Sequence, residues 1–441
     1  MPSLPIPLLP LPIYFLLRPN LKTPAAIPAF LYDGAMNKPH DIPSTPLSPA
    51  AVDTHSVMFI TQRPELVMTE GLGSWLVDHN GKRYLDFLQG WAVNCLGHSN
   101  PGMIAAMNAQ ARKLINPSPA FYNEPMIRLS NLLTEQSCFN RVFFANSGAE
   151  ANEGAIKLAR KWGQLHKSGA YEIITFEHSF HGRTLATMSA SGKPGWDTMF
   201  APQVPGFLKA ELNDLESVKK LISSKTVAVM VEPVQGEGGV IPTTTAFMEG
   251  LRALAHEHKV LLIVDEVQAG CGRTGKLFAY QHYNIKPDIM TLGKGIGGGV
   301  PLAALLATEE VACFVPGDQG GTYNGNALMT AVGISVIEQL LAPGFLDEVV
   351  RKGELLSREL QTLATEFNLE GERGKGLLRA LMLGKDVGPK LVEMARDQGP
   401  EGLLINSPRP NLLRFMPSLA VTDAEIKQMC GMLRGLLQQA H

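Results

Sequence analysis

From about residue 71 onward, hydrophobic and polar residues alternate in the pattern typical of a large α/β protein. Short apolar runs are separated by longer stretches with helical spacing. The runs are Val142–Ala145, Glu172–Phe176, Val227–Val231, Leu261–Val264 and Ala303–Ala307. Strands of a parallel sheet are buried on both faces, so they are apolar throughout. The pattern therefore predicts an α/β fold with a mostly parallel sheet and helices on both faces.

The segments around these runs carry their own signals. Gly73–Phe87 has the pattern of a hairpin with Asn80-Gly81 at its turn. A helix is expected near Met103–Leu114, and the last helix is expected to start at Thr422–Glu425, a capping-box pattern. At 441 residues the chain is long enough for two or three domains of roughly 150 residues each. We expect a large domain over 96–330 and a smaller α+β domain formed by 51–95 and 331–441.

Residues 1–50 do not share this pattern. Leu4–Leu17 is apolar, but it contains four prolines and is shorter than the roughly 20 residues of a membrane helix. No basic residue precedes Arg18, whereas a secretory signal peptide begins with one. We interpret residues 1–50 as a disordered extension. We also hypothesise that translation starts at Met36, which the intact mass of the native protein would test.

Composition and charge narrow the classes of function. The formal net charge is −2 and charged residues make up 18% of the chain, which gives no sign of attraction to nucleic acid or an anionic membrane. The five cysteines are scattered, with no Cys-x-x-Cys pair, and this indicates reduced thiols in the cytosol. We therefore expect a cytoplasmic protein with small-molecule substrates and with neither a nucleic-acid nor a membrane partner.

Polar residues follow several of the apolar runs. Asn146-Ser147, Glu232 and Asp265 each stand where a predicted strand ends. In open α/β sheets, ligands bind outside the carboxyl ends of the strands. We therefore expect these side chains to converge on one crevice.

Lys294 lies in a glycine-rich segment, Leu292–Gly299, directly after a short predicted strand. A lysine amine can form a Schiff base with an aldehyde, and a carboxylate such as Asp265 can keep a ring nitrogen protonated. Together these groups are what pyridoxal-phosphate chemistry requires of a protein. Taken alone, a lysine such as Lys294 is usually a solvated loop residue. The glycines favour the first interpretation, because they leave room for a planar group.

Two further segments add possible ligand contacts. Asn146–Glu153 leads from a strand into a helix, where free backbone N–H groups and the helix dipole can bind phosphate; a plain helix cap is the alternative. In Ser179–Thr184, Phe180 can stack on a flat cofactor and Arg183 can bind a carboxylate with two hydrogen bonds. Taken alone, a phenylalanine such as Phe180 is more often a core residue. His178 and His181 have no third ligand nearby in the sequence, so we predict no metal.

Gly270–Leu277 gives a rival interpretation. It matches the dinucleotide pattern G-x-G-x-x-G, and it nearly matches a P-loop. Leu277 stands where a P-loop has the Ser or Thr that binds magnesium. Little room remains for a helix before Pro287, as a dinucleotide site requires. Because the G-x-G-x-x-G pattern is nevertheless present, a nicotinamide dehydrogenase stays as the alternative from a different enzyme class.

Taken together, the motifs resemble the class III (ω-amino) aminotransferases, which have fold type I among pyridoxal-phosphate enzymes. The resemblance runs from about residue 60 to the C-terminus and rests on motifs in the family's order. These motifs are Ser147–Asn152, Phe180–Thr184, Glu232–Glu237, Asp265–Gln268, Gly293–Gly295 and Gly321–Asn326. Among subfamilies the chain is most similar to acetylornithine aminotransferases, as Gly90–His98 and Leu412–Pro417 also indicate.

The resemblance implies a role for each matching residue around the cofactor ring. Lys294 would hold the aldehyde and later move a proton, and Asp265 would pair with the pyridinium nitrogen. Phe180 and Val267 would sandwich the ring, with Gln268 near its hydroxyl group.

The resemblance also implies the contacts of the cofactor phosphate. Ser147, Gly148 and Ala149 would bind it. Thr322 would reach the phosphate in the neighbouring subunit, so the active form would be a homodimer.

For the substrates, the resemblance implies that Arg183 and Arg414 bind carboxylates, with Gly321 beside them. Glu237 would pair with Arg414 when a substrate has only one carboxylate. The implied reaction transfers the ω-amino group of N2-acetyl-L-ornithine to 2-oxoglutarate, a step of arginine biosynthesis. Succinylornithine, ornithine, N-succinyldiaminopimelate and 4-aminobutyrate are the alternative donors.

Three residues depart from the family's usual pattern. Trp91 replaces a smaller aliphatic residue, Asn324 a glycine and Ala327 a proline. Trp91 bears on the acyl-group preference, and the other two bear on the shape of the loop that carries Thr322.

Overall fold

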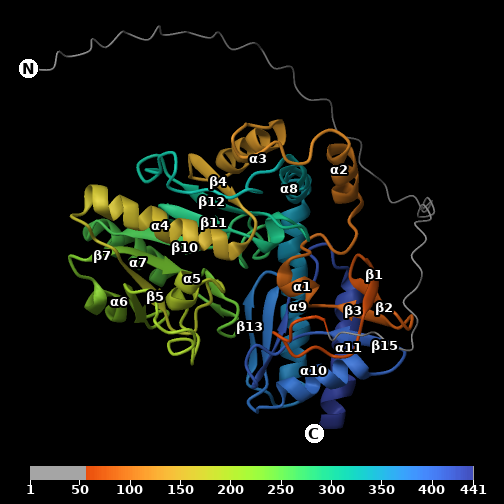
Figure 1. Ribbon diagram of the computed structural model, residues 1–441. Helices are drawn as coiled ribbons and strands as arrows, with labels where there is room; N and C mark the ends of the chain where they lie inside the picture. The colour runs from red at the N-terminus through yellow and green to blue at the C-terminus, as the bar shows by residue number, and fades with distance from the viewer. Residues whose placement is uncertain (1–55, 441) are drawn as a thin grey trace, which may run out of the picture. The chain divides into compact units, whose positions relative to one another are not determined.

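A seven-stranded sheet forms the centre of the computed structural model, which describes residues 56–440 (Figure 1). The predictions for residues 1–50, including a start at Met36, lie outside the described residues. In spatial order the strands are β4 (Arg141–Ala145), β12 (Ala303–Ala307), β11 (Ile289–Leu292), β10 (Leu261–Asp265), β7 (Thr226–Val231), β5 (Glu172–Phe176) and β6 (Phe207–Ala210). The strands from β11 to β6 run parallel, whereas β12 is antiparallel to both of its neighbours. This confirms the α/β fold with a mostly parallel sheet.

Helices cover both faces of this sheet. Successive residues of a strand point to opposite faces, so each strand contributes side chains to two cores. On β10, Leu261 and Ile263 share a core with residues of α4 (Gly148–His166). Leu262 and Val264 pack in a second core, which includes residues of α7 (Thr245–Glu257). Both layers bury aliphatic side chains completely, which explains why the strand sequence is apolar without interruption.

Residues from both ends of the described chain share a second sheet. The strands β1 (Met68–Leu72), β2 (Trp75–Asp78) and β3 (Arg83–Asp86) are antiparallel, and β15 (Glu401–Leu404) adds to β3 in parallel. The predicted hairpin is therefore confirmed. Gly81 at its turn has a φ of 80°, a conformation that glycine adopts at no steric cost.

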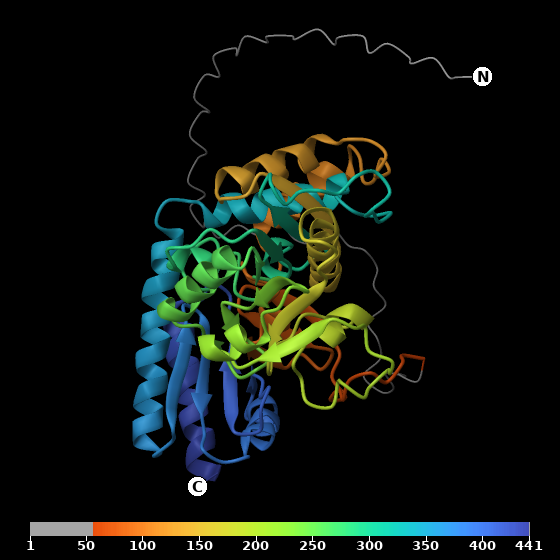
Figure 2. The ribbon, with the colours of Figure 1, turned by 90° about the vertical axis from the view of Figure 1, so that its left-hand side faces the viewer.

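A third, antiparallel sheet belongs to the C-terminal part. It consists of β13 (Gly371–Lys375), β14 (Leu378–Met382) and β16 (Leu412–Phe415). The long helix α9 (Phe345–Glu366) runs beside β13 and β14 (Figure 2). The helices α10 (Gly388–Asp397) and α11 (Asp423–Ala440) complete this part. The capping box predicted for the last helix is present, since Thr422 and Glu425 exchange hydrogen bonds of 2.8 and 3.2 Å.

Two helices, α2 (Pro101–Ala111) and α3 (Glu124–Glu135), pack against a third, α8 (Ala327–Leu340), near β4. The helix expected at Met103–Leu114 thus begins two residues earlier, because the Asn100 side chain caps it by accepting a hydrogen bond from Met103 N at 3.1 Å. No single helix of residues 56–440 is long and apolar enough to cross a membrane, although α8 and α9, bent by 72°, pass that test as a pair.

The shorter elements are connections. They are α1 (Gln89–Ala92), α5 (Leu185–Ala190), α6 (Leu215–Leu221), β8 (Val234–Gln235), β9 (Ile241–Pro242) and the 3₁₀ turns η1 (Ala279–His282) and η2 (Lys294–Ile296). α1 is a left-handed turn, because all four of its residues have positive φ. It contacts η2.

Candidate functional site

Asp265 ends the central strand β10, and its buried carboxylate accepts three hydrogen bonds. Oδ2 accepts from Asn152 Nδ2 at 2.8 Å and from His181 Nδ1 at 2.7 Å. Oδ1 accepts from the backbone N–H of Val267 at 3.0 Å. Both lone-pair directions of Oδ2 are therefore used, while Oδ1 keeps one for a further donor. This is the arrangement expected of a carboxylate that receives a ring N–H.

The two donors to Asp265 are themselves held in place. Asn152 Oδ1 accepts from Thr291 Oγ1 at 2.7 Å, which fixes which end of the amide faces Asp265. His181 Nε2 is buried and has no hydrogen-bond partner within residues 56–440. We assign Nδ1 of His181 as the donor in this contact, because the carboxylate oxygen of Asp265 is the acceptor.

Lys294 begins the turn η2 with a φ of 44°. Its amine makes no hydrogen bond or ion pair within the described part of the chain. Burial lowers the pKa of Lys294 from its ordinary value, and the carboxylate of Glu237 is the largest influence in the opposite direction. A neutral, unpaired amine is the form that attacks an aldehyde or accepts a proton.

The first turn of α4 has free donors that could hold an anion. Ser147 Oγ accepts from Glu150 N at 3.2 Å, and the Glu150 carboxylate accepts from Ser147 N at 3.1 Å. The backbone N–H groups of Gly148 and Ala149 have no partner within residues 56–440. These two donors lie at the positive end of a helix of 19 residues, where a phosphate binds favourably.

Glycines allow this turn to touch the neighbouring segments. A Cβ on Gly148 would lie 2.6 Å from Val267 Cγ1, and one on Gly293 would lie 3.1 Å from the same atom. The helix start, the second residue after Asp265 and the residue before Lys294 are therefore in direct contact. The free N–H groups of the helix start, the Asp265 carboxylate and Lys294 thus lie on segments that touch, and these groups suit the phosphate, ring nitrogen and aldehyde of pyridoxal phosphate.

Phe180 is half-buried, and its backbone N–H donates to Glu232 Oε1 at 2.9 Å. Burial, and secondarily the charge of Asp265, raise the pKa of Glu232 well above its ordinary range. Glu232 therefore helps to place Phe180. The sequence motif included Glu232 without indicating this role.

The two arginines predicted to bind carboxylates differ in their surroundings. Arg414 is fully buried and lies 2.7 Å from Glu237 Oε1. It also donates to Asn406 Oδ1 at 2.9 Å and to Gln268 Oε1 at 3.3 Å. Arg183 is exposed and forms no hydrogen bond or ion pair within residues 56–440. Arg414 is thus paired with protein groups, whereas the guanidinium of Arg183 is available to a ligand.

Gln268 lies beside Arg414 because a glycine permits it. A Cβ on Gly236 would lie 1.5 Å from Gln268 Oε1, so no larger residue fits there without displacing the amide. Burial would raise the pKa of Glu237, but the nearby Arg414 guanidinium outweighs it and holds that pKa below its ordinary value. Glu237 is therefore ionised at neutral pH.

Gly321 and Thr322 lie on an exposed loop. Thr322 O accepts from Asn116 Nδ2 at 3.1 Å, and Asn324 Oδ1 accepts from Asn146 Nδ2 at 2.7 Å. The Thr322 hydroxyl has no hydrogen-bond partner within the described residues. Asn324, one of the three departures from the family's pattern, ties this loop to the residue before Ser147.

Gly270–Leu277 does not form a nucleotide site. It forms turns, and the element after it is η1, a 3₁₀ turn of four residues rather than an α-helix. Arg273 is buried and donates to Pro417 O at 2.5 Å and to Leu377 O at 3.2 Å. The segment therefore joins the large sheet to the C-terminal part.

Comparison with known proteins agrees with this geometry. Residues 60–437 match the family described as aminotransferase class-III. The acetylornithine aminotransferase of Ralstonia nicotianae is 73% identical over 387 residues, which are 87% of this chain and 97% of that protein. Acetylornithine aminotransferase 2 of Bordetella pertussis is 65% identical, with 87% and 97% covered. The solved ornithine aminotransferase of Toxoplasma gondii superposes with a TM-score of 0.82 at 31% identity, covering 87% of this chain and 93% of that one.

Proposed function

This chain belongs to the class III aminotransferases, and we propose that it transfers the ω-amino group of N2-acetyl-L-ornithine to 2-oxoglutarate. The products are N-acetylglutamate 5-semialdehyde and glutamate, which places the reaction in arginine biosynthesis. The family uses pyridoxal phosphate, which supplies an electron sink when bound. The observation that carries the proposal is the contrast between a free Arg183 and an Arg414 paired with Glu237.

Arg183 binds the carboxylate that both substrates share. Its guanidinium is exposed and has no anionic partner among the described residues. A carboxylate can therefore take two parallel hydrogen bonds from it without displacing a protein group. N-acetylornithine places its single carboxylate there, and 2-oxoglutarate places its distal one.

Glu237 decides whether Arg414 is available. N-acetylornithine has no second carboxylate, so the ion pair between Glu237 and Arg414 stays closed and no cation is left buried without a partner. 2-Oxoglutarate has a second carboxylate beside its keto group. That group replaces Glu237 on Arg414, and Glu237, 30% exposed, turns toward solvent. One pocket thus accepts two differently charged substrates in turn.

Lys294 transfers the proton, and Asp265 stabilises the protonated ring nitrogen. Burial lowers the pKa of Lys294, which favours the neutral amine, the form that can take a proton from the substrate carbon and later give one back. Asp265, held in place by Asn152 and His181, would keep a proton on the ring nitrogen. Phe180 and Val267 keep the ring plane fixed from either side.

The choice of donor rests on the names of the relatives together with the site. Both curated relatives described above are acetylornithine aminotransferases, at 73% and 65% identity. Trp91, which is 50% exposed, stands in the left-handed turn α1 next to η2. We place its indole at the wall that contacts the acyl group.

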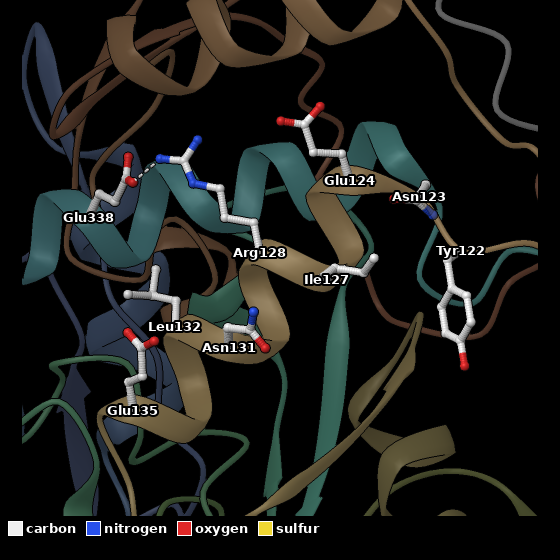
Figure 3. A pocket seen from close by; sticks show the side chains of 9 residues that line it. All are labelled: Tyr122, Asn123, Glu124, Ile127, Arg128, Asn131, Leu132, Glu135 and Glu338. Carbon is white, nitrogen blue, oxygen red and sulfur yellow. Dashed lines mark hydrogen bonds and ion pairs between the residues drawn. The ribbon is translucent and has the colours of Figure 1, made fainter. Parts of the chain in front are cut away.

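We propose that the active form is a homodimer. Apolar side chains are exposed around α3 and the Thr322 loop, namely Ile115 (53%), Phe121 (67%), Tyr122 (85%), Ile127 (45%) and Tyr323 (65%). A hollow of about 630 Å³ lies on the outer side of α3 and α8, and Tyr122 and Ile127 line it (Figure 3). Exposed apolar surface of this kind is typical of protein interfaces. A second copy that covers it brings its Thr322 to the phosphate of the first.

Mixing two inactive variants tests the shared site. A Lys294→Ala subunit still supplies Thr322, and a Thr322→Ala subunit still supplies Lys294. Co-expression of the two forms one complete site per mixed dimer, so activity should exceed that of either variant alone. No gain on mixing would contradict a site completed across the interface.

We place the enzyme in the cytoplasm, on the support of the cysteines. All five lie among residues 56–440 and are free thiols. Free thiols persist in the reducing cytosol. Fractionation of native cells followed by activity assay would check this.

Steady-state assays test the function itself. The expected result is glutamate formation from N-acetylornithine and 2-oxoglutarate, with parallel double-reciprocal lines as the second substrate varies. The value of kcat/KM should exceed those for N-succinylornithine, ornithine, N-succinyldiaminopimelate and 4-aminobutyrate. Arg183→Ala should raise KM for donor and acceptor alike. A rise for only one of them would contradict the shared-carboxylate account.

A further inference from the structure

Trp196 lies in the loop between α5 and β6, and its side chain is only 4% exposed. Two hydrogen bonds fix its backbone: Trp196 N donates to Lys193 O at 3.2 Å, and Trp196 O accepts from Gln203 Nε2 at 2.9 Å. An indole held in this way is a rigid surface. No step of the proposed reaction uses it.

The indole contacts both residues that the reaction draws from Phe180–Thr184. The Phe180 ring centroid is 5.6 Å from that of Trp196, in a tilted arrangement. Arg183 Cζ lies 4.9 Å from the Trp196 ring centroid and 6.0 Å from that of Phe180. The guanidinium therefore rests near two aromatic rings, one of which faces the cofactor site.

Within residues 56–440, the Arg183 side chain interacts only with these two rings. A cation attracted to an aromatic face keeps its in-plane N–H groups free. Those N–H groups are the ones that bind a carboxylate with two hydrogen bonds. Aromatic contact thus holds Arg183 without occupying its binding edge, which a protein carboxylate would do.

We infer that Trp196 is a positioning residue that holds Arg183 in place for the substrate carboxylate. An exposed arginine otherwise loses side-chain freedom each time a substrate binds. The Trp196 ring removes part of that freedom beforehand, so it strengthens the binding of every substrate with a carboxylate. This inference rests on the role proposed for Arg183.

Lys193 is a second cation at the same ring, with its Nζ 5.3 Å from the Trp196 centroid. It is exposed and also influences Glu237. The indole thus has two cationic neighbours, and the experiment must separate them.

The test compares Trp196→Leu and Trp196→Phe in the holoenzyme. Leu removes the aromatic face, whereas Phe retains one. For Trp196→Leu we expect kcat/KM for N-acetylornithine and for 2-oxoglutarate to fall by roughly 2- to 30-fold, the range of single cation–π contacts. The change should lie in KM, and Trp196→Phe should recover most of it. A simple ω-amine without a carboxylate should lose far less.

Trp75→Leu is the matched control. Trp75 holds Arg83, whose Cζ lies 4.3 Å from its ring centroid, in the N-terminal sheet. This variant loses the same kind of contact and should leave both KM values unchanged. Thermal melting of each variant identifies a loss of folded protein.

A double-mutant cycle locates the effect. If Trp196 acts through Arg183, Trp196→Leu should change little once Arg183→Gln is present, and should keep its effect in Lys193→Gln. An effect that persists in Arg183→Gln and disappears in Lys193→Gln would overturn the inference. So would unchanged KM values in a folded Trp196→Leu protein. If Arg183→Gln alone leaves KM unchanged, it is the proposed role of Arg183 that fails.

Discussion

Glu237 Oε1 lies 2.7 Å from Nη2 of the fully buried Arg414. This ion pair closes one of two arginine sites, while the other, Arg183, has no anionic partner within the described residues. The asymmetry provides a physical basis for alternating between a substrate with one carboxylate and a substrate with two.

Glu237→Gln should separate the two halves of the reaction. Without the Glu237 charge, Arg414 remains a buried and poorly compensated cation when N-acetylornithine is bound. The donor kcat/KM should therefore fall by roughly 10- to 100-fold, as expected when a buried charged group loses its partner. The 2-oxoglutarate half should be unchanged or faster, which single-turnover kinetics of each half can show. The exposed pair of Arg141 and Glu309 offers a control, because Glu309→Gln should change neither half.

Lys294→Ala should bind pyridoxal phosphate but lose nearly all turnover. The phosphate donors and Asp265 remain, whereas the amine that holds the aldehyde and moves the proton is gone. We expect a loss of at least about 10³-fold, within the range that acid–base catalysis supplies. Equilibrium dialysis of the cofactor and a glutamate assay measure the two properties. Lys276→Ala, at an exposed lysine, is the control, and near-normal turnover of Lys294→Ala would refute the assignment.

Cofactor capture by the apoenzyme should depend on pH in a defined direction. Attack on the aldehyde needs the neutral amine, and burial lowers the pKa of Lys294 below the ordinary 10.5. A lowered pKa makes the amine neutral at lower pH. The capture rate should therefore rise with pH and level off well before an exposed lysine would do so.

Glu237→Gln should move that profile further toward acid, because Glu237 is the largest influence that raises the pKa of Lys294. Stopped-flow absorbance after mixing apoenzyme with pyridoxal phosphate gives the rate at each pH. A midpoint near 10.5, or an alkaline shift in Glu237→Gln, would contradict this account.

Thr291→Val should weaken cofactor binding although Thr291 does not contact the cofactor. Its hydroxyl orients the Asn152 amide, which donates to Asp265. Loss of that bond costs roughly 1 kcal/mol, or about fivefold in affinity. Fluorescence titration of the apoenzyme measures it. Thr362→Val, on the exposed side of α9, should have no effect, and equal affinities in both variants would argue against the network.

Local sequence signals predicted the parts of the site that lie on one segment. The helix start at Asn146–Glu153, the strand before Asp265 and the glycines around Lys294 depend on residues within a few positions of each other. These features could be predicted from the sequence. So could every strand of the central sheet except the edge strand β6 (Phe207–Ala210).

The network behind Asp265 could not be predicted in the same way. Thr291 lies beside Asp265 because β10 and β11 pair in that register, and register is set by the packing of the whole sheet. Asn152 lies one helical turn after Gly148, so its direction toward β10 depends on how α4 packs. Trp196 stands in a loop with no motif, and only its contacts in space connect it to Arg183.

The most direct test of the central claim is a titration of the purified holoenzyme with one amine at a time, followed by the visible absorption of the cofactor. N-acetylornithine, ornithine and 4-aminobutyrate are compared without any keto acid. The account predicts that the absorption changes at far lower concentrations of N-acetylornithine than of the other two amines. A band that responds only to ornithine or 4-aminobutyrate, or to none of the three, would contradict it.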